Sequence, residues 1–281
     1  MAIRFGSLMA RCGIQWPANY LSRNLSSAPK SLTSAPKSLT SNSIDDDEVA
    51  KFNTSADTWW KPNLLHTMNT VRVPIIRDGI LSVHGITTKK PLPLEGFRLL
   101  DVGCGGGILC EPLARLGAKV TGLDPGEENI KIATLHSSID AEIKDRINYV
   151  CDTVENLVVT STEKYDAIVC SEVIEHVANP QSFVNSCYEL VKDGGSMFFT
   201  TMSRTTMSYI TTILLAEYIL NIVSPGLHDW NKYVTPKELS DMLKQLNCRV
   251  VSIQGYIYNP ATQKFVYTEN SDVMYALHAV K

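Results

Sequence analysis

Apolar and polar residues alternate in blocks along the middle of the chain, and these blocks predict strands separated by helices. Short apolar runs typical of buried strands lie near 98–102, 119–123, 147–151, 165–170 and 196–201. Apolar residues at helical spacing lie near 107–116, 127–136 and 181–192. Because strands that alternate with helices pair in parallel and are covered on both faces, the pattern predicts an α/β fold built on a mostly parallel sheet.

Both ends of the chain extend this pattern. Apolar residues at helical spacing predict N-terminal helices within 45–85, the second of them over 70–83. Farther along, a capping box that begins at Thr235 predicts another helix. Strand-like stretches near 249–257 and 272–280 are predicted to finish the sheet as a hairpin, which gives seven strands in all.

One apolar stretch does not fit the alternation. Residues 207–223 are rich in Ile, Leu, Tyr and Met, but they include Thr211, Thr212 and Glu217. About 17 residues of this mixed composition are too few and too polar to span a membrane. We therefore expect 204–230 to be an insertion that forms an amphipathic lid or lies in a membrane interface. The alternative is a helix that buries its apolar face on the domain.

The first 44 residues differ in composition from the rest of the chain. They hold five basic residues and no acidic one, are rich in Ser and Thr, and repeat the sequence of 27–33 verbatim at 34–40. This composition is typical of a mitochondrial transit peptide followed by a disordered linker. We therefore expect the folded domain to occupy 45–281, with a disordered tail that has no targeting role as the alternative for 1–44.

Composition and charge narrow the class of protein. The full chain has 44% hydrophobic and 20% charged residues, as an ordinary globular domain does. Without the five basic residues of 1–44, 21 Lys and Arg face 29 Asp and Glu, so the domain has no basic surplus to hold a nucleic acid. The seven cysteines are odd in number and form no CxxC pair, which predicts reduced thiols rather than disulfides or a zinc site.

The most informative motif follows the first predicted strand. Four glycines between 103 and 107 lie where a strand turns into a helix, which lets the backbone approach a nucleotide. Asp124 ends the next strand roughly 20 residues downstream, where a carboxylate reaches ribose hydroxyls. The spacing is G-x-G-x-G, and Ile108 occupies the third small position of the dinucleotide fingerprint, which argues against an NAD-dependent oxidoreductase. The loop resembles the S-adenosylmethionine loop of class I methyltransferases; a tight turn without a ligand is the alternative.

A second cluster of chemistry-bearing residues follows the fourth predicted strand. Glu172, Glu175 and His176 lie at the carboxyl edge of the sheet, where open α/β folds bind ligands. If the segment forms a helical turn, the three side chains project to one side and offer an O,O,N ligand set, which suits Mg²⁺ and does not exclude Mn²⁺ or Zn²⁺. Two alternatives stay open: the glutamates complement a helix dipole beside a packed histidine, or His176 is a general base that a glutamate orients.

From about Val49 to Lys281, the residues resemble the ubiquinone biosynthesis O-methyltransferases. The matching segments are Asn69–Pro74, Leu100–Gly107, Gly122–Pro125, Ser171–Val177, Gly226–Trp230 and Tyr258–Pro260. The sequence departs from the usual family pattern at Leu227, where relatives often have threonine. The glycine loop alone indicates only a methyltransferase, whereas the E-x-x-E-H segment and the N-terminal arginine together are far more specific.

The resemblance implies a Rossmann-like class I methyltransferase fold that uses S-adenosylmethionine to methylate hydroxyl groups of polyprenylated dihydroxybenzene intermediates of ubiquinone synthesis. It implies cofactor binding by Arg72, Gly103, Asp124 and Ser171, Mg²⁺ binding by Glu172, Glu175 and His176, and catalytic roles for His176 and Glu172. Arg72 would pair with the methionine carboxylate. It also implies a mitochondrial matrix enzyme, peripheral on the inner membrane, in a multi-enzyme quinone-synthesis complex.

Two other functions compete with this interpretation. A methyltransferase fold can serve as a non-catalytic scaffold of the quinone-synthesis complex, but a scaffold would tolerate a broken glycine loop or a missing acidic partner, and both features are intact here. A small-molecule methyltransferase with another acceptor, such as an amine, is the second, since a fold does not determine the acceptor atom.

Overall fold

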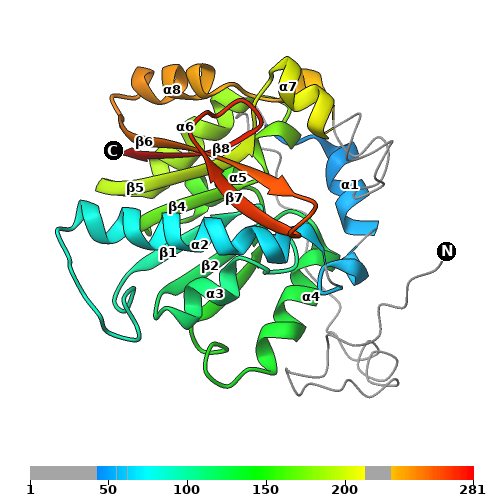
Figure 1. The fold of residues 1–281 in the computed structure, drawn as a ribbon. Coiled ribbons are helices and arrows are strands. Elements are labelled where there is room, and N and C mark those ends of the chain that lie inside the picture. Colours follow the sequence, from blue (N-terminus) through cyan, green and yellow to red (C-terminus); the bar gives the residue numbers. More distant parts are fainter. Residues whose placement is uncertain (1–42, 55, 62, 213–228) are drawn as a thin grey trace. The chain divides into compact units, whose positions relative to one another are not determined.

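The computed structural model describes residues 43–54, 56–61, 63–212 and 229–281 (Figure 1). Within these residues the strands form one sheet in the order β3-β2-β1-β4-β5-β8-β6-β7. The strands are β1 (Arg98–Val102), β2 (Lys119–Asp124), β3 (Ile147–Cys151), β4 (Tyr165–Ser171), β5 (Val191–Met202), β6 (Arg249–Asn259), β7 (Lys264–Thr268) and β8 (Met274–Val280). Strands β1 to β5 pair in parallel, and β8, β6 and β7 continue the sheet antiparallel.

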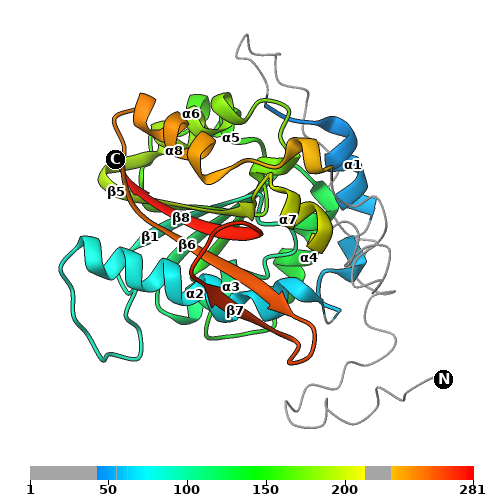
Figure 2. The same ribbon diagram turned by 45° about the horizontal axis from the view of Figure 1, so that its top comes forward.

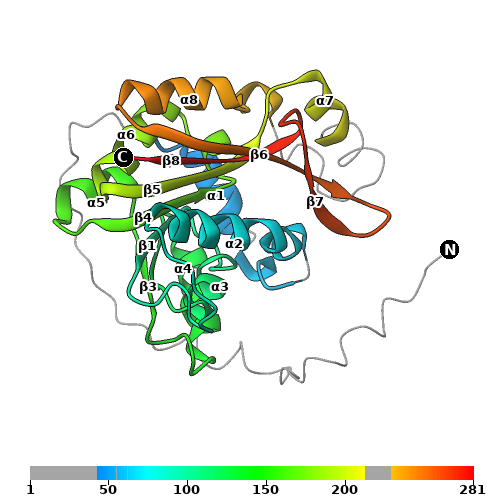
Figure 3. The same cartoon turned by 60° about the vertical axis from the view of Figure 1, so that its left-hand side comes forward.

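Helices cover both faces of this sheet. They are α1 (Asp46–Thr54), α2 (Leu64–Val83), α3 (Cys110–Arg115), α4 (Glu127–Ser138), α5 (Val154–Thr160), α6 (Pro180–Leu190), α7 (Thr206–Ser208) and α8 (Pro236–Gln245), with short 3₁₀ turns η1 (Ala56–Thr58), η2 (Ile174–His176) and η4 (Trp230–Lys232). Figure 3 shows α2, α3 and α4 on one side of the sheet and α5, α6 and α8 on the other.

Alternating side chains of the central strands supply the two cores. Leu99 of β1 belongs to the cluster that includes Ile80 of α2, whereas the next residue, Leu100, belongs to the cluster that includes Phe183 of α6. This alternation is the two-residue period of a strand, and each fully buried Leu contributes roughly 1.5–3 kcal/mol to the free energy of folding. The two packed faces hold the strand ends rigidly, and the loops at the carboxyl ends of β1, β2 and β4 carry the candidate site.

The sequence prediction of an α/β fold with a mostly parallel sheet is confirmed, but the number of strands was wrong. The sheet has eight described strands rather than seven, because β7 forms within the connection between the two predicted final strands. Figure 2 shows β6 and β7 together at one edge of the sheet. The two predicted final strands do pair antiparallel, and β8 lies between β5 and β6.

Several boundaries also differ from the prediction. Helix α2 begins at Leu64 instead of residue 70, because the Asn63 side chain caps it by accepting a hydrogen bond from the Leu65 N–H at 2.9 Å. The predicted insertion at 204–230 lies partly outside the described residues, which stop at 212 and resume at 229. Most of the predicted transit segment, 1–44, also lies outside them. In the described part of the chain, no helix is long and apolar enough to cross a membrane.

Candidate active site

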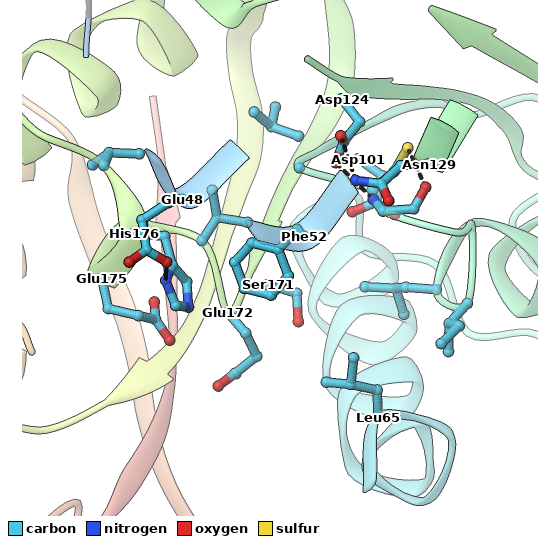
Figure 4. Close-up of a pocket in the computed structure, with 18 of the residues that line it drawn as sticks. Glu48, Phe52, Leu65, Asp101, Asp124, Asn129, Ser171, Glu172, Glu175 and His176 are labelled. Carbon is cyan, nitrogen blue, oxygen red and sulfur yellow. Dashed lines mark hydrogen bonds and ion pairs between the residues drawn. The ribbon is translucent and has the colours of Figure 1, made fainter. Parts of the chain in front are cut away.

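A cavity of about 890 Å³ lies at the carboxyl ends of the parallel strands (Figure 4). Every site residue predicted from the sequence lines it: Arg72, Gly103, Asp124, Ser171, Glu172, Glu175 and His176. These residues come from four segments that are separated by up to about a hundred positions, so the fold brings the predicted set to one place. A cavity of this size matches the usual range for small-molecule and cofactor sites, roughly 300–1,000 Å³.

The glycine loop after β1 forms one wall of the cavity. Gly103 has a φ of +71°, and a Cβ at this position would lie 2.5 Å from Cγ2 of Val173. The left-handed backbone and the close contact both require glycine. The Gly103 N–H donates to the Leu123 carbonyl at 2.7 Å, which ties the loop to the end of β2.

Asp124 fixes the same loop from β2. One carboxylate oxygen accepts from the Gly105 N–H at 2.9 Å, and the other accepts from the Gly126 N–H at 2.8 Å and from Asn129 Nδ2 at 3.0 Å. The side chain is buried, and this burial raises its pKa. Trp59, which directly follows η1, packs on the glycine loop. Its Nε1 donates to Asn129 Oδ1 at 2.8 Å. This side of the cavity, which we call the cofactor side because the sequence predicts cofactor binding by Gly103 and Asp124, is therefore a network in which each Asp124 oxygen has a donor.

The sequence analysis missed a second acid on this side. Asp152 follows β3 and lines the cavity, and its N–H donates to the Asp124 carbonyl at 3.2 Å. Its own carboxylate accepts from the Thr153 N–H at 2.8 Å. The signal was available, because an acid directly after a parallel strand is the same feature that identified Asp124.

Arg72 brings a positive charge into the cavity from α2. The side chain is only 3% exposed. It donates to Ser171 Oγ at 2.7 Å, to the Leu65 carbonyl at 2.8 Å and to Asn69 Oδ1 at 2.6 Å. Burial lowers the pKa of the guanidinium, and the nearby Glu172 charge opposes that shift. Because these hydrogen-bond partners are all uncharged, a carboxylate on a ligand is the natural complement to this charge.

On the opposite side of the cavity, the E-x-x-E-H segment does not form one helical turn. Glu172 has a φ of +56°, so the chain turns sharply before η2 begins at Ile174. The predicted helical projection of Glu172, Glu175 and His176 is therefore wrong in its geometry. Across residues 43–212 and 229–281, apart from positions 55 and 62, no group of three His, Cys, Asp or Glu side chains is arranged to hold a metal ion.

The two glutamates have different surroundings. Glu172 Oε1 accepts from Thr200 Oγ1 at 2.8 Å and from the Tyr256 hydroxyl at 3.1 Å. Glu175 is 2% exposed; its Oε2 accepts from Thr201 Oγ1 at 2.8 Å, and its buried Oε1 has no hydrogen-bond partner among the described residues. Burial, reinforced by the Glu172 charge, raises the Glu175 pKa well above its usual range. A buried oxygen without a donor is rare and costly, and a bound ligand can satisfy it.

His176 contacts a helix that the sequence analysis did not connect with it. Its Nδ1 lies 2.9 Å from Glu48 Oε2 of α1, and the Phe52 ring meets the imidazole at a centroid distance of 5.0 Å and an angle of 86°. Figure 4 shows Glu48 and Phe52 on the side of His176 that faces α1. Apolar spacing predicted that residues near 49–56 form a helix, but no sequence signal shows that this helix packs against a residue 128 positions away.

Comparison with known proteins places these features in context. Residues 72–253 match the family of methyltransferase domains. The chain is 44% identical over 246 residues to the mitochondrial ubiquinone biosynthesis O-methyltransferase of Rattus norvegicus, covering 86% of this chain and 71% of that protein. It is 42% identical over 241 residues to the ubiquinone biosynthesis O-methyltransferase of Methylobacterium nodulans, covering 84% and 95%. It spans 65% of the human relative, with 42% identity.

A solved structure shows the same fold. The magnesium protoporphyrin IX methyltransferase of Synechocystis PCC 6803, with bound S-adenosylmethionine, superimposes with a TM-score of 0.55 over 86% of this chain and 100% of that one, at 15% identity. This likeness confirms the Rossmann-like class I methyltransferase architecture.

Proposed function

The chain belongs to the family of ubiquinone biosynthesis O-methyltransferases, and on that premise we propose how its cavity performs the methyl transfer. It is an S-adenosylmethionine-dependent O-methyltransferase of ubiquinone synthesis. We propose that the acceptor is a hydroxyl group of a polyprenylated dihydroxybenzene, and that Glu172, Glu175 and His176 hold Mg²⁺ beside it.

The cofactor side needs little rearrangement to bind S-adenosylmethionine. The glycine loop and Asp124 are tied together by hydrogen bonds, which leaves Asp124 where ribose hydroxyls bind in folds of this class. Arg72 supplies a buried positive charge for the methionine carboxylate, and Ser171 donates or accepts beside it. The sulfonium is a good leaving group, so these residues mainly hold the methyl donor in line with the acceptor and exclude water.

The buried Glu175 Oε1 is the observation that carries the metal proposal. It is a buried carboxyl oxygen without a hydrogen-bond partner, beside a second carboxylate and an imidazole that line the same cavity. Oxygen-rich sets with one imidazole suit Mg²⁺ and related divalent ions. When bound, such an ion favours the ionised form of a catechol hydroxyl near neutral pH. In the structure, the Glu172, Glu175 and His176 side chains are not arranged around a common point. We therefore propose that the ion and the substrate draw them together.

A second candidate chemistry needs no metal. His176 is held at Nδ1 by Glu48, which is the arrangement that orients an imidazole for general-base catalysis. In this alternative His176 removes the acceptor proton, and the unpartnered Glu175 oxygen accepts a hydrogen bond from the substrate. The scaffold and other-acceptor alternatives make different predictions, because neither requires catechol methylation.

We also propose where the protein works. Relatives from rat, human and Arabidopsis thaliana are named mitochondrial, and on this basis we propose a mitochondrial matrix enzyme, peripheral on the inner membrane and part of a multi-enzyme complex. Apolar residues such as Leu64, Met68 and Phe265 line the cavity and suit an isoprenoid tail. If segment 204–230 contacts lipid, replacing Ile213 and Leu214 with Asp should weaken liposome binding and leave S-adenosylmethionine binding intact; unchanged liposome binding would contradict this role.

Methyl transfer by the purified full chain to a short-tailed dihydroxybenzene tests the proposed chemistry. The assay compares chelated and Mg²⁺-supplied protein, Glu172→Ala and His176→Ala, with the exposed Glu189→Ala as a control. Loss on chelation and in both site variants supports the metal-assisted reaction. Activity that survives chelation but not His176→Ala would replace the ion with a general base. Cofactor binding without any catechol methylation would favour the scaffold function.

A further inference from the structure

Two residues of helix α1 contact the His176 ring. Glu48 Oε2 lies 2.9 Å from Nδ1, and Phe52, one helical turn later, packs edge-on against the same ring. Residues four apart lie on one face of a helix, so α1 presents a carboxylate and an aromatic ring to the imidazole together. The His176 and Glu48 side chains are only 16% and 20% exposed, which limits competition from water.

Helix α1 is itself fixed in place over the cavity. Lys232 Nζ lies 2.9 Å from Asp45 Oδ2 and 3.8 Å from Glu48 Oε1. Just before the helix, the Ser43 carbonyl accepts from the Ala178 N–H at 2.7 Å, two residues beyond His176. Figures 1 and 2 both show α1 at the end of the sheet that carries the cavity. The Glu48 carboxylate is therefore held between a lysine at one oxygen and the imidazole at the other.

We propose that Glu48 is a positioning residue for the methyl-transfer reaction. By accepting a hydrogen bond from Nδ1–H of His176, it fixes the imidazole tautomer and leaves the lone pair on Nε2. A carboxylate at the second ring nitrogen is the usual partner of a metal-binding or basic histidine, because it sets ring orientation and raises basicity. The inference rests on the proposed function, since both candidate roles of His176, metal ligand and general base, require that lone pair.

The contributions of Glu48 and Phe52 to the His176 ring differ in kind. Both Glu48 and Phe52, which contact the His176 ring, belong to α1. Phe52 supplies shape and Glu48 supplies the acceptor, so the two roles can be separated. A neutral side chain of the same size at position 48 keeps the packing and removes the charge.

The test compares Glu48→Gln with Asp47→Asn. Asp47 is exposed, lies in the same first helical turn and undergoes the same change of charge. Because outer partners of this kind typically change activity or metal affinity by roughly 10–100-fold, we expect Glu48→Gln to lower kcat by that factor and to weaken Mn²⁺ binding similarly. The KM for S-adenosylmethionine should stay within about twofold, and Asp47→Asn should match the wild type. Glu48→Asp keeps the charge on a side chain that is one methylene shorter. Its kcat and Mn²⁺ affinity should lie between those of Glu48→Gln and the wild type.

A spectroscopic readout separates positioning from a structural role. In ¹⁵N-histidine-labelled protein, with the His176 signals assigned by their loss in His176→Gln, we expect Nδ1 to be protonated in the wild type and the tautomer to shift in Glu48→Met, which has no oxygen to accept from Nδ1–H. The same tautomer in both proteins, or equal kcat in Glu48→Gln and Asp47→Asn, would overturn the inference. The proposed function fails differently: wild-type protein would then neither bind Mn²⁺ nor methylate a catechol, whereas the nitrogen signals would still report on Glu48.

Discussion

The two sides of the cavity are built in different ways. On the cofactor side, Asp124 has hydrogen-bond donors at both oxygens and belongs to a motif that spans about 20 residues. On the acceptor side, Glu175 keeps one buried oxygen without a partner, and His176 is held by a helix 128 positions earlier in the chain. Figure 4 shows the two groups apart, with Asp124 and Asn129 in one and Glu48, Glu175 and His176 in the other.

This difference shows which half of the site is complete before its ligands arrive. A carboxylate with satisfied oxygens gains little from a rearrangement, so the cofactor side has its hydrogen bonds in place before any ligand binds. A buried oxygen without a donor costs roughly 1–3 kcal/mol, and more when charged, which a cation or substrate hydroxyl can recover. The acceptor side therefore depends on what binds there, and changes on the two sides should affect different steps.

Gly103→Ala should have the largest effect, and it breaks the cofactor side alone. Its φ of +71° disfavours alanine by roughly 1–3 kcal/mol, and the new Cβ would lie 2.5 Å from Val173. We expect S-adenosylmethionine binding to be abolished in calorimetric titrations. Gly85→Ala is the matched control, because its φ is +62° but no atom lies within 4 Å of the added Cβ. Tight cofactor binding by Gly103→Ala would show that the loop is not preformed.

Glu175→Gln should break the acceptor side and spare the cofactor side. The change removes the carboxyl group, which a cation would need in its ionised form, and keeps the size of the side chain. We expect methyl transfer to fall by at least about 100-fold, because outer-sphere changes alone cost up to that much, while cofactor affinity stays within about twofold. A matching loss of cofactor affinity would mean that the two sides are not separable.

Asp101→Asn sharpens the comparison through pH. Asp101 is a buried residue of β1 that lines the cavity, and burial raises its pKa to about 6 from a usual value of 3.8. The folded state therefore binds the proton more tightly than the unfolded state, so this contribution to stability is lost as pH rises from about 4 to 6. We expect the ligand-free variant to exceed the wild type by roughly 2–3 kcal/mol in unfolding free energy at pH 7, and to equal it near pH 4. Urea denaturation across this range measures the difference; a constant gap would contradict it.

Tyr256→Phe should have the smallest effect. Its hydroxyl donates to Glu172 Oε1 at 3.1 Å, and a hydrogen bond to a charged group contributes roughly 1.5–3 kcal/mol when fully buried. Because Thr200 still donates to the same oxygen, we expect only a three- to tenfold fall in kcat, without a change in cofactor affinity. Tyr267→Phe serves as the control, since its half-exposed ring lies on β7 and its hydroxyl donates to the Val71 carbonyl.

The sequence predicted the cofactor side better than the acceptor side for a physical reason. Gly103 and Asp124 are linked by strand order and a short loop, which local pattern and motif spacing describe well. The positions of Glu172 and His176 were also found, but not their geometry, because a left-handed residue at 172 interrupts the expected turn. Glu48 could not be found, since helical spacing does not show which distant segment a helix packs against.

The fold shows the same limit. The parallel core followed from buried apolar runs, whereas β7 was missed because Lys264–Thr268 is short and buries only Phe265 deeply. Its place in the sheet depends on pairing with the end of β6, which is a tertiary contact.

The central claim, that a metal ion completes the acceptor side, is tested most directly by crystals of the full chain grown with Mn²⁺, S-adenosylhomocysteine and a catechol. The account predicts an anomalous peak at bonding distance, roughly 2.0–2.3 Å, from Glu175 Oε1, with Glu172 and His176 as further ligands. A map with the catechol and cofactor in the cavity, but with no peak at Glu175, would contradict it.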